Sequence, residues 1–236
     1  QFGQPRGLVS RALARLSARK LGTQSCPILF EAPLATGLLG NLVQAASGGA
    51  LYRNASFLVD GIGKPLFPSH ITVHEAPHVP QAGGSSPFDE EGVRGLERDV
   101  VADGVLTGYF LSTYSARKLG MKSTGNAGGS YNLSLHSTLR RPGDDFKAML
   151  RKLGTGLLVT EMIGQGVNYV TGDYSRGAAG YWVENGAIQY PVEEITIAGN
   201  LRQMFANVAA VGADTVVRGS KVSGSVLIEG MTIGGS

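Results

Sequence analysis

The chain has 236 residues, a formal net charge of +3, 35 glycines and a single cysteine. Its hydrophobic content of 42% excludes a disordered, highly charged tail, and one cysteine excludes both an internal disulfide and a metal site built from several cysteines. No stretch reaches the ~18 apolar residues of a membrane span and the first residues lack the apolar core of a signal peptide, so we expect a cytoplasmic protein with no membrane partner.

The excess of positive charge lies at the beginning of the chain. The first 20 residues carry five basic and no acidic side chains, whereas the rest carries 16 basic and 18 acidic ones. Arg11, Arg15 and Arg19 recur every four residues beside an apolar stripe, which predicts a basic amphipathic helix over residues 7–21. The body of the chain is not basic, which argues against a nucleic-acid partner. We assign residues 1–22 to the end of a preceding segment and 23–236 to the main domain.

The first part of the main domain predicts one strand and one helix. Residues 26–30 form a short apolar run typical of a buried strand, in which Cys26 is an inert thiol. Residues 36–54 read as a helix whose small residues would let another backbone approach closely. Residues 55–62 and 71–73 look extended, and 77–87, with three prolines, predicts a loop.

Hairpin signals multiply after that loop. Residues 100–111 contain an Asp-Gly turn between apolar runs, and residues 181–192 contain an Asn-Gly turn in the same setting. Residues 222–228 and 231–233 suggest a third pair of strands.

Two helices interrupt these strands. One is predicted over residues 145–153 and ends before Gly154, and the other over 201–211, with Asn200 as its N-cap and Gly212 as its end. Hairpins with separate helices predict an α+β fold of mostly antiparallel β-sheet with a few packed helices.

One stretch matches the zinc motif H-E-x-x-H, at His74-Glu75-Ala76-Pro77-His78. The motif needs a helix, which places both imidazoles on one face beside the carboxylate. Residues 71–73 have a strand pattern instead, and Pro77 cannot lie inside a helix, so we reject a zinc site of His74, Glu75 and His78. Adventitious metal binding at His70, His74 and His78 stays open.

Two glycine-rich stretches, 123–133 and 172–180, also carry hydrogen-bonding side chains. Glycines allow a backbone to lie close to a ligand or a partner chain, and they equally suit tight turns at a sheet edge. The residues alone leave both interpretations open.

These stretches and several others resemble the PmbA/TldD family of peptidase-related proteins, and its PmbA branch in particular. The resemblance covers nearly the whole chain, residues 21–235. It is carried by FDEEG (88–92), STYSARKLG (112–120), STGNAGG (123–129), GTGLLVTEMIGQG (154–166), TGDYSRGAAG (171–180), residues 181–200 ending in ITIAGN, and GSVL (224–227).

The resemblance implies the fold and the setting. Residues 23–236 would be the C-terminal domain of a two-domain protein whose N-terminal α/β domain is absent from this chain. In the TldD branch this domain carries a zinc helix with H-E-x-x-x-H, and a PmbA-type subunit pairs with it to cut unfolded peptides. Older family names refer to modulation of DNA gyrase.

Alignment with the zinc helix of that branch places Val43 and Gly48 at the two histidine positions and Gln44 at the glutamate position. A cysteine ligand near the C-terminus of that branch corresponds to a region that here has Ser223. The resemblance therefore implies a catalytically silent subunit without a cofactor, whose TldD-like partner holds the zinc.

The leading hypothesis is a PmbA-type subunit of a zinc metallopeptidase, in a heterodimer or homodimer. The alternatives are a metallopeptidase active by itself, for instance through His74 and His78, and a non-enzymatic module that binds protein or nucleic acid. Whether the chain is itself an enzyme stays open. The residues expected to contact a peptide or the partner are Tyr114, Arg117, Thr124, Asn126, Asp173, Tyr174 and Arg176.

Overall fold

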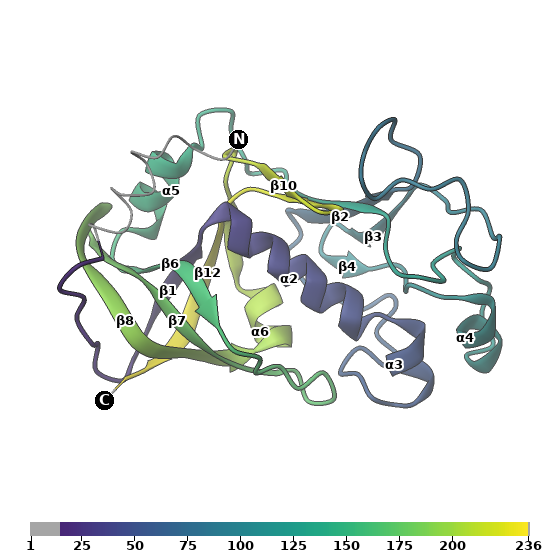
Figure 1. Ribbon diagram of the computed structural model, residues 1–236, viewed down its shortest axis with the longest axis horizontal. Helices are drawn as coiled ribbons and strands as arrows, with labels where there is room; N and C mark the ends of the chain where they lie inside the picture. Colours follow the sequence, from purple (N-terminus) through teal and green to yellow (C-terminus); the bar gives the residue numbers. More distant parts are fainter. Residues whose placement is uncertain (1–14, 236) are drawn as a thin grey trace.

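Two β-sheets with a long helix, α2, between them make up the computed structural model, which describes residues 15–235 (Figure 1). The first sheet has the order β1 (Gln24–Phe30), β6 (Gly156–Ile163), β7 (Asp173–Glu184), β8 (Ala187–Asn200), β12 (Val226–Gly234) and β9 (Val208–Val211). The second has the order β10 (Val216–Arg218), β11 (Lys221–Ser223), β5 (Asn132–Ser137), β2 (Ile71–Ala76), β3 (Arg98–Ala102) and β4 (Val105–Leu106). The helices are α2 (Ala32–Ala45), α3 (Gly48–Tyr52), α4 (Thr113–Lys118), α5 (Phe146–Leu153) and α6 (Leu201–Ala206).

The first sheet closes on itself, because β1 pairs with both β6 and β12. Both faces of β1 are apolar, as expected for a strand covered on both sides. Ile28 and Phe30 face the main core, whereas Leu29 packs in a second cluster with Met149 and Leu153 of α5. The predicted buried strand over residues 26–30 is thus confirmed, and so is the predicted helix that begins after Asp145.

The β7–β8 hairpin confirms the Asn-Gly turn, with Asn185 and Gly186 both at positive φ. Its strands extend far beyond the predicted residues, so residues 173–180 lie in β7 and not in a tight turn. The glycines there permit close strand packing: a Cβ on Gly180 would lie within 1.9 Å of the Leu158 carbonyl oxygen. The Asp-Gly hairpin of β3 and β4 is also confirmed, with shorter strands.

The predicted helix over residues 36–54 is two helices. The first begins earlier, at Ala32, where a proline in the first turn suits a helix start. It ends at Ala45, and Ser47 is extended, with φ −71° and ψ 136°. The Ser47 hydroxyl accepts from the Ala50 N–H and so caps α3. The break is held by Phe110, which exchanges backbone hydrogen bonds with Ala46 and Gly48.

Three other predicted elements are wrong. Residues 55–62 form turns, with Asp60 at positive φ. The predicted helix over 201–211 ends at Ala206, because residues 208–211 pair with β12 as strand β9. The third hairpin does not exist: β11 belongs to the second sheet, and residues 226–234 form one strand, in which Gly230 lies in a bulge instead of a turn.

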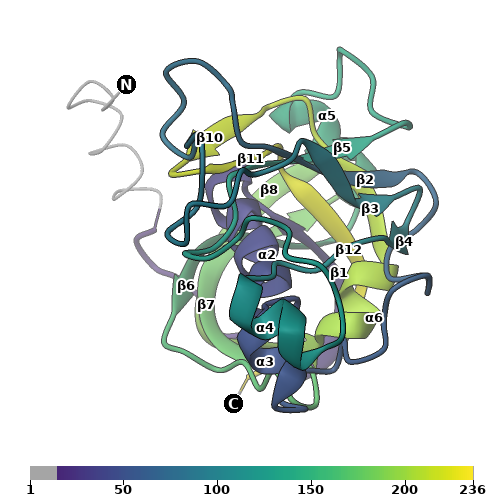
Figure 2. The ribbon, with the colours of Figure 1, turned by 90° about the vertical axis from the view of Figure 1, so that its right-hand side faces the viewer.

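Despite these differences, the α+β fold with mostly antiparallel sheet is confirmed. The parallel pairs are β1 with β6 and β5 with β11. Figure 2 shows α3 and α4 together at one end of the molecule, in front of α2. None of the helices in the described part of the chain is long and apolar enough to cross a membrane.

Most of the predicted basic helix over residues 7–21 lies outside the described residues. The described part, from Arg15 on, is a turn followed by an extended stretch, and not a helix. Arg19 forms a bridge with Val192 and its guanidinium lies 4.4 Å from the centre of the Tyr190 ring. Lys20 forms an ion pair with Glu194 at 2.8 Å. Through these contacts the segment lies along β8, and it does not form the predicted helix.

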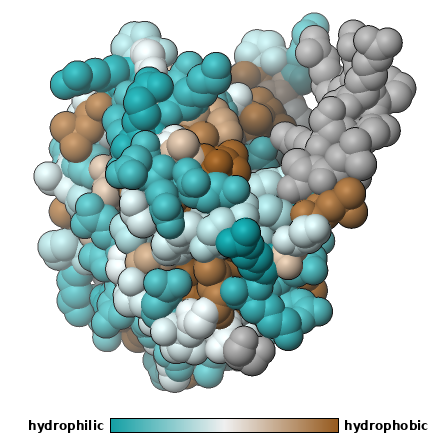
Figure 3. All heavy atoms as spheres, turned by 90° about the vertical axis from the view of Figure 1, so that its left-hand side faces the viewer, coloured by the Kyte–Doolittle hydropathy of each residue, from teal (hydrophilic) through white to brown (hydrophobic). Residues whose placement is uncertain are grey.

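The face at the left of Figure 1 is mostly hydrophilic, and its hydrophobic residues gather in several separate patches instead of one (Figure 3). An extensive exposed apolar patch would mark a docking surface. Because this face shows no single large patch, the concave surface beside α2 is the better candidate for a functional site.

Cys26 should be unreactive in the folded protein. Burial raises the pKa of its thiol to about 11, against the opposite effect of a backbone hydrogen bond at Leu157. At pH 8 only ~0.1% of such a thiol is thiolate, so we expect modification by a disulfide reagent to be on the order of 100-fold slower than in the denatured chain. Stopped-flow measurement of the two rates checks this, and equal rates would contradict the buried position.

Candidate functional site

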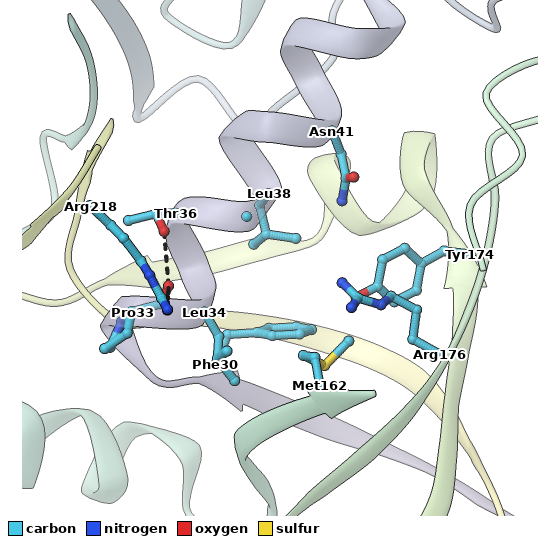
Figure 4. A pocket seen from close by; sticks show the side chains of 11 residues that line it. Phe30, Pro33, Leu34, Thr36, Leu38, Asn41, Met162, Tyr174, Arg176 and Arg218 are labelled. Atoms are coloured by element: carbon cyan, nitrogen blue, oxygen red, sulfur yellow. Dashed lines mark hydrogen bonds between the residues drawn. The ribbon is translucent and has the colours of Figure 1, made fainter. Parts of the chain in front are cut away.

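A groove of about 320 Å³ lies where α2 passes over the ends of β1, β6 and β7 (Figure 4). The tip of β10, from the second sheet, completes its wall. Its size is at the lower end of the range for small-ligand sites. The residues that line it are Phe30, Pro33, Leu34, Thr36, Gly37, Leu38, Asn41, Met162, Tyr174, Arg176 and Arg218.

Helix periodicity gives α2 its groove-facing side. Leu34, Leu38 and Asn41 are spaced four and three residues apart, which places them on one face of the helix. Met162 adds apolar surface from the sheet, and the buried Phe30 lies behind it. The groove thus has an apolar floor with polar groups at its ends.

Two arginines lie on opposite sides of this floor (Figure 4). The Nε and Nη2 atoms of Arg176 both donate to the Gly164 carbonyl, at 3.0 and 2.7 Å. Arg218 donates to the Pro33 carbonyl at 3.4 Å. Neither guanidinium pairs with a carboxylate among the described residues, and no acidic side chain lines the groove. The groove is therefore cationic.

Tyr174 lies beside Arg176 in the wall. Burial raises the pKa of its hydroxyl to about 12, although the Arg176 guanidinium acts in the opposite direction. The phenol is therefore neutral at physiological pH. Because the lining holds no carboxylate, imidazole or thiol, the groove is suited to binding an anion and not to proton transfer.

The predicted site residues fall into separate places, and only Tyr174 and Arg176 line this groove. Asp173 is exposed on the opposite side of the strand. It accepts hydrogen bonds from Thr171 at 2.6 Å and Asn200 at 3.3 Å, and both hold the pKa of its carboxyl below the ordinary value. These bonds tie the start of β7 to the end of β8.

Thr124 and Asn126 have internal roles. The Thr124 hydroxyl accepts from the Leu111 N–H at 2.8 Å. Asn126 is 5% exposed and donates to the Glu75 carboxylate at 2.8 Å, while accepting from Arg98 at 3.2 Å. The predicted contact with a peptide or partner at these two residues remains a prediction, and their hydrogen bonds explain them as supports of the loop.

Tyr114 and Arg117 lie on α4, outside the groove. The Tyr114 side chain is 53% exposed and packs edge-on against Tyr52 of α3, with ring centres 5.7 Å apart. Lys118 lies over the same ring. Arg117 is exposed. This pair remains a candidate for partner contact, but it does not join Tyr174 and Arg176.

The histidine motif lies on strand β2 and the following loop, as its residues predict. His74 contacts Asp99 at 2.8 Å and Glu97 at 3.2 Å, whereas Glu75 is 1% exposed and pairs with Arg98 on the other face. His78 contacts the Gly95 carbonyl at 3.0 Å. His70 contacts the Ser137 hydroxyl and the Val208 carbonyl. The three motif side chains thus have separate surroundings.

The positions implied for the zinc ligands do not fit a metal. Val43 packs against the core on α2, Gln44 is exposed, and Gly48 begins α3 beyond the break. A Cβ on Gly48 would lie 2.2 Å from the Ser115 hydroxyl, so no side chain fits there without movement. Ser223 is fully buried and donates to the Gly224 carbonyl.

No three His, Cys, Asp or Glu side chains among residues 15–235 are placed to hold one metal ion. Residues 1–14 and Ser236 contain none of these residue types.

Asn41 and Arg218 also line the groove, and neither is among the site residues predicted from the sequence. Asn41 accepts from the Tyr169 hydroxyl at 3.0 Å, and its amide nitrogen has no partner among the described residues. Asn41 would have been predictable if the bounds of α2 had been known, because helical spacing places it on the same face as Leu34 and Leu38. For Arg218, the short strands Val216–Arg218 and Lys221–Ser223 around Gly219 predict a hairpin, but nothing in the sequence predicts that its tip reaches α2.

Comparison with known proteins extends over nearly the whole chain. Residues 23–235 match the family described as the PmbA/TldA metallopeptidase C-terminal domain. A protein named metalloprotease PmbA from Escherichia coli O157:H7 is 53% identical over 225 residues, which cover 95% of this chain and 49% of that protein. A metalloprotease PmbA homolog from Haemophilus influenzae is 48% identical and covers 96% of this chain and 49% of its own length. The chain spans about half the length of these relatives.

Solved structures show the same fold. A crystal structure from Bacteroides thetaiotaomicron, named as a candidate modulator of DNA gyrase, has a TM-score of 0.90 and 28% identity, covering 98% of this chain and 52% of that one. TldE from Thermococcus kodakarensis has a TM-score of 0.82, covers 98% of this chain and 55% of that one, and shares 21% identity, so that likeness concerns the fold alone.

Proposed function

The chain belongs to the PmbA/TldA metallopeptidase family, and from this premise we propose that it is a catalytically silent, PmbA-type subunit of a cytoplasmic two-component zinc peptidase. In this proposal a TldD-like subunit holds the zinc and hydrolyses the peptide bond. The present chain binds that subunit and helps to hold an unfolded peptide. A heterodimer follows from these roles.

One observation carries the proposal: the helix turn where the resemblance places the zinc ligands offers none. Val43 and Gly48 have no side-chain donor atom, Gln44 lacks the carboxylate of the motif, and the space that a side chain at 48 would need is filled by Ser115. Zinc catalysis requires three protein ligands and an open position for water. Nothing in the arrangement of residues 15–235 supplies a substitute set elsewhere.

The groove beside α2 supports the peptide-holding part of the proposal. It offers an apolar floor and two cations but no group suited to acid–base chemistry. Tyr114 and Arg117, exposed on α4, are proposed as contacts with the partner subunit.

The test is hydrolysis of an unfolded peptide by the protein alone and mixed with a TldD-like subunit, with the zinc content of each measured. We expect no hydrolysis and no stoichiometric zinc for the lone protein, and hydrolysis that a chelator abolishes for the mixture. Chelator-sensitive cleavage by the lone protein would overturn the proposal. In that event His78→Ala decides whether the histidine motif is responsible, through loss of both zinc and activity.

A further inference from the structure

The two arginine side chains of the α2 groove form no ion pair with an acidic side chain in the described part of the chain. Arg176 from β7 and Arg218 from β10 flank the floor, and neither pairs with any described carboxylate. Arginine presents a planar fork of donors that matches a carboxylate. Two such groups around a groove that lacks acidic residues favour an anionic ligand.

Arg176 is fixed in position for this role. Its Nε and Nη2 atoms donate to the Gly164 carbonyl at 3.0 and 2.7 Å, and the guanidinium also interacts with the Tyr174 hydroxyl. The buried Tyr174 hydroxyl lies beside it as a neutral group. A cation that is already held in place loses little rotamer entropy when a ligand binds.

The residues that line the groove between the two arginines determine which chemical groups the rest of the ligand can have. Leu34 and Met162 offer apolar contacts, and the buried Phe30 lies beneath them. The Asn41 amide nitrogen has no partner in the described part of the chain, because only its oxygen is engaged, by Tyr169. A peptide carbonyl would satisfy this donor, whereas a hydrocarbon chain would bury it unpaired at a cost. A groove of about 320 Å³ accommodates only a short segment.

We propose that this groove binds the C-terminal end of a peptide, with its free carboxylate at Arg176 and an apolar last side chain on the floor, while Arg218 adds positive charge on the other side of the floor. The inference rests on the proposed function in naming a peptide, and it deepens that function by naming the end that is held. Binding requires neither zinc nor a partner subunit, so it can be tested separately.

The experiment measures the affinity of the 236-residue chain for a fluorescent hexapeptide that ends in leucine, as the free acid and as the C-terminal amide. We expect the acid to bind roughly tenfold more tightly, because charge-assisted hydrogen bonds are lost with the amide. Arg176→Gln should weaken binding of the acid towards that of the amide and leave the amide unchanged, whereas Arg218→Gln, which removes a charge on the other side of the floor, should weaken binding of the acid less. Arg151→Gln, an equal loss of charge on the exposed face of α5, should change neither.

Competition with octanoate distinguishes a peptide end from a fatty acid. Displacement only by the free-acid peptide, or far more readily by it, supports the proposal. Equal binding of acid and amide, an unchanged Arg176→Gln variant, or preferential binding of octanoate would each overturn it. None of these outcomes depends on hydrolysis, so the proposed function would still stand on its own test.

Discussion

Replacing Arg98 with methionine should lower the free energy of unfolding by about 3–5 kcal/mol, because it leaves a buried carboxylate without its cation. Glu75 is 1% exposed, and the Arg98 Nε lies 2.9 Å from its Oε2 atom. Arg98 also donates to the Tyr109 carbonyl and to Asn126. Both the charge pair and the support of the 123–131 loop are lost together.

Urea unfolding, followed by the fluorescence of the single tryptophan, Trp182, measures this effect. Arg94→Met, on the exposed loop before β3, removes the same charge and should change stability by less than about 0.5 kcal/mol. A double variant, Glu75→Leu with Arg98→Met, should recover only part of the loss, because it removes the unpaired charge but leaves Asn126 and the Tyr131 N–H without the Glu75 carboxylate as acceptor. A loss below about 1 kcal/mol in Arg98→Met would show that water or neighbouring groups compensate Glu75.

The same ion pair illustrates how far the sequence can be read. The strand over residues 71–73 and the loop after it were predictable from apolar alternation and from Pro77. The pairing of Glu75 with Arg98 was not, because it requires the register of β2 against β3 and the approach of Asn126 from a distant loop. Glu75 therefore matches the glutamate of a zinc motif in the sequence, whereas in the structure it is a buried carboxylate paired with Arg98.

The Asp-Gly and Asn-Gly sequences predict hairpins at Asp103-Gly104 and Asn185-Gly186, because these residue types tolerate the positive φ of such turns. In the structure φ is positive at all four residues. Residues 208–211 were assigned to a helix, since local propensity does not reveal that β12 offers them a partner. The groove shows the same limit. Tyr174 and Arg176 lie in one stretch that the sequence singles out and both line the groove, whereas Arg218 reaches it only through the packing of the second sheet on α2.

Substitution of the zinc-motif residues into α2 should strongly destabilise the chain and should not create a zinc site. In the variant Val43→His, Gln44→Glu, Gly48→His, the histidine at position 48 would meet the Ser115 hydroxyl 2.2 Å from its Cβ, and Leu111 at 3.0 Å. Overpacking of this kind costs about 3 kcal/mol. The two imidazoles would also lie on different helices, because extended Ser47 separates α2 from α3. We expect a strongly destabilised chain without stoichiometric zinc.

Controls separate the two obstacles. Val43→His with Gln44→Glu leaves Gly48 intact and should cost much less stability than the full graft. Adding Ser115→Gly to the full graft removes the two atoms nearest to a Cβ at 48, although Leu111 stays, so stability should partly return. Zinc binding should not return, since the break at Ser47 remains. Zinc analysis and urea unfolding of the three variants check this. One tightly bound zinc per chain in the rescued graft would mean that packing at Ser115, and not the break between α2 and α3, keeps this helix from holding a metal.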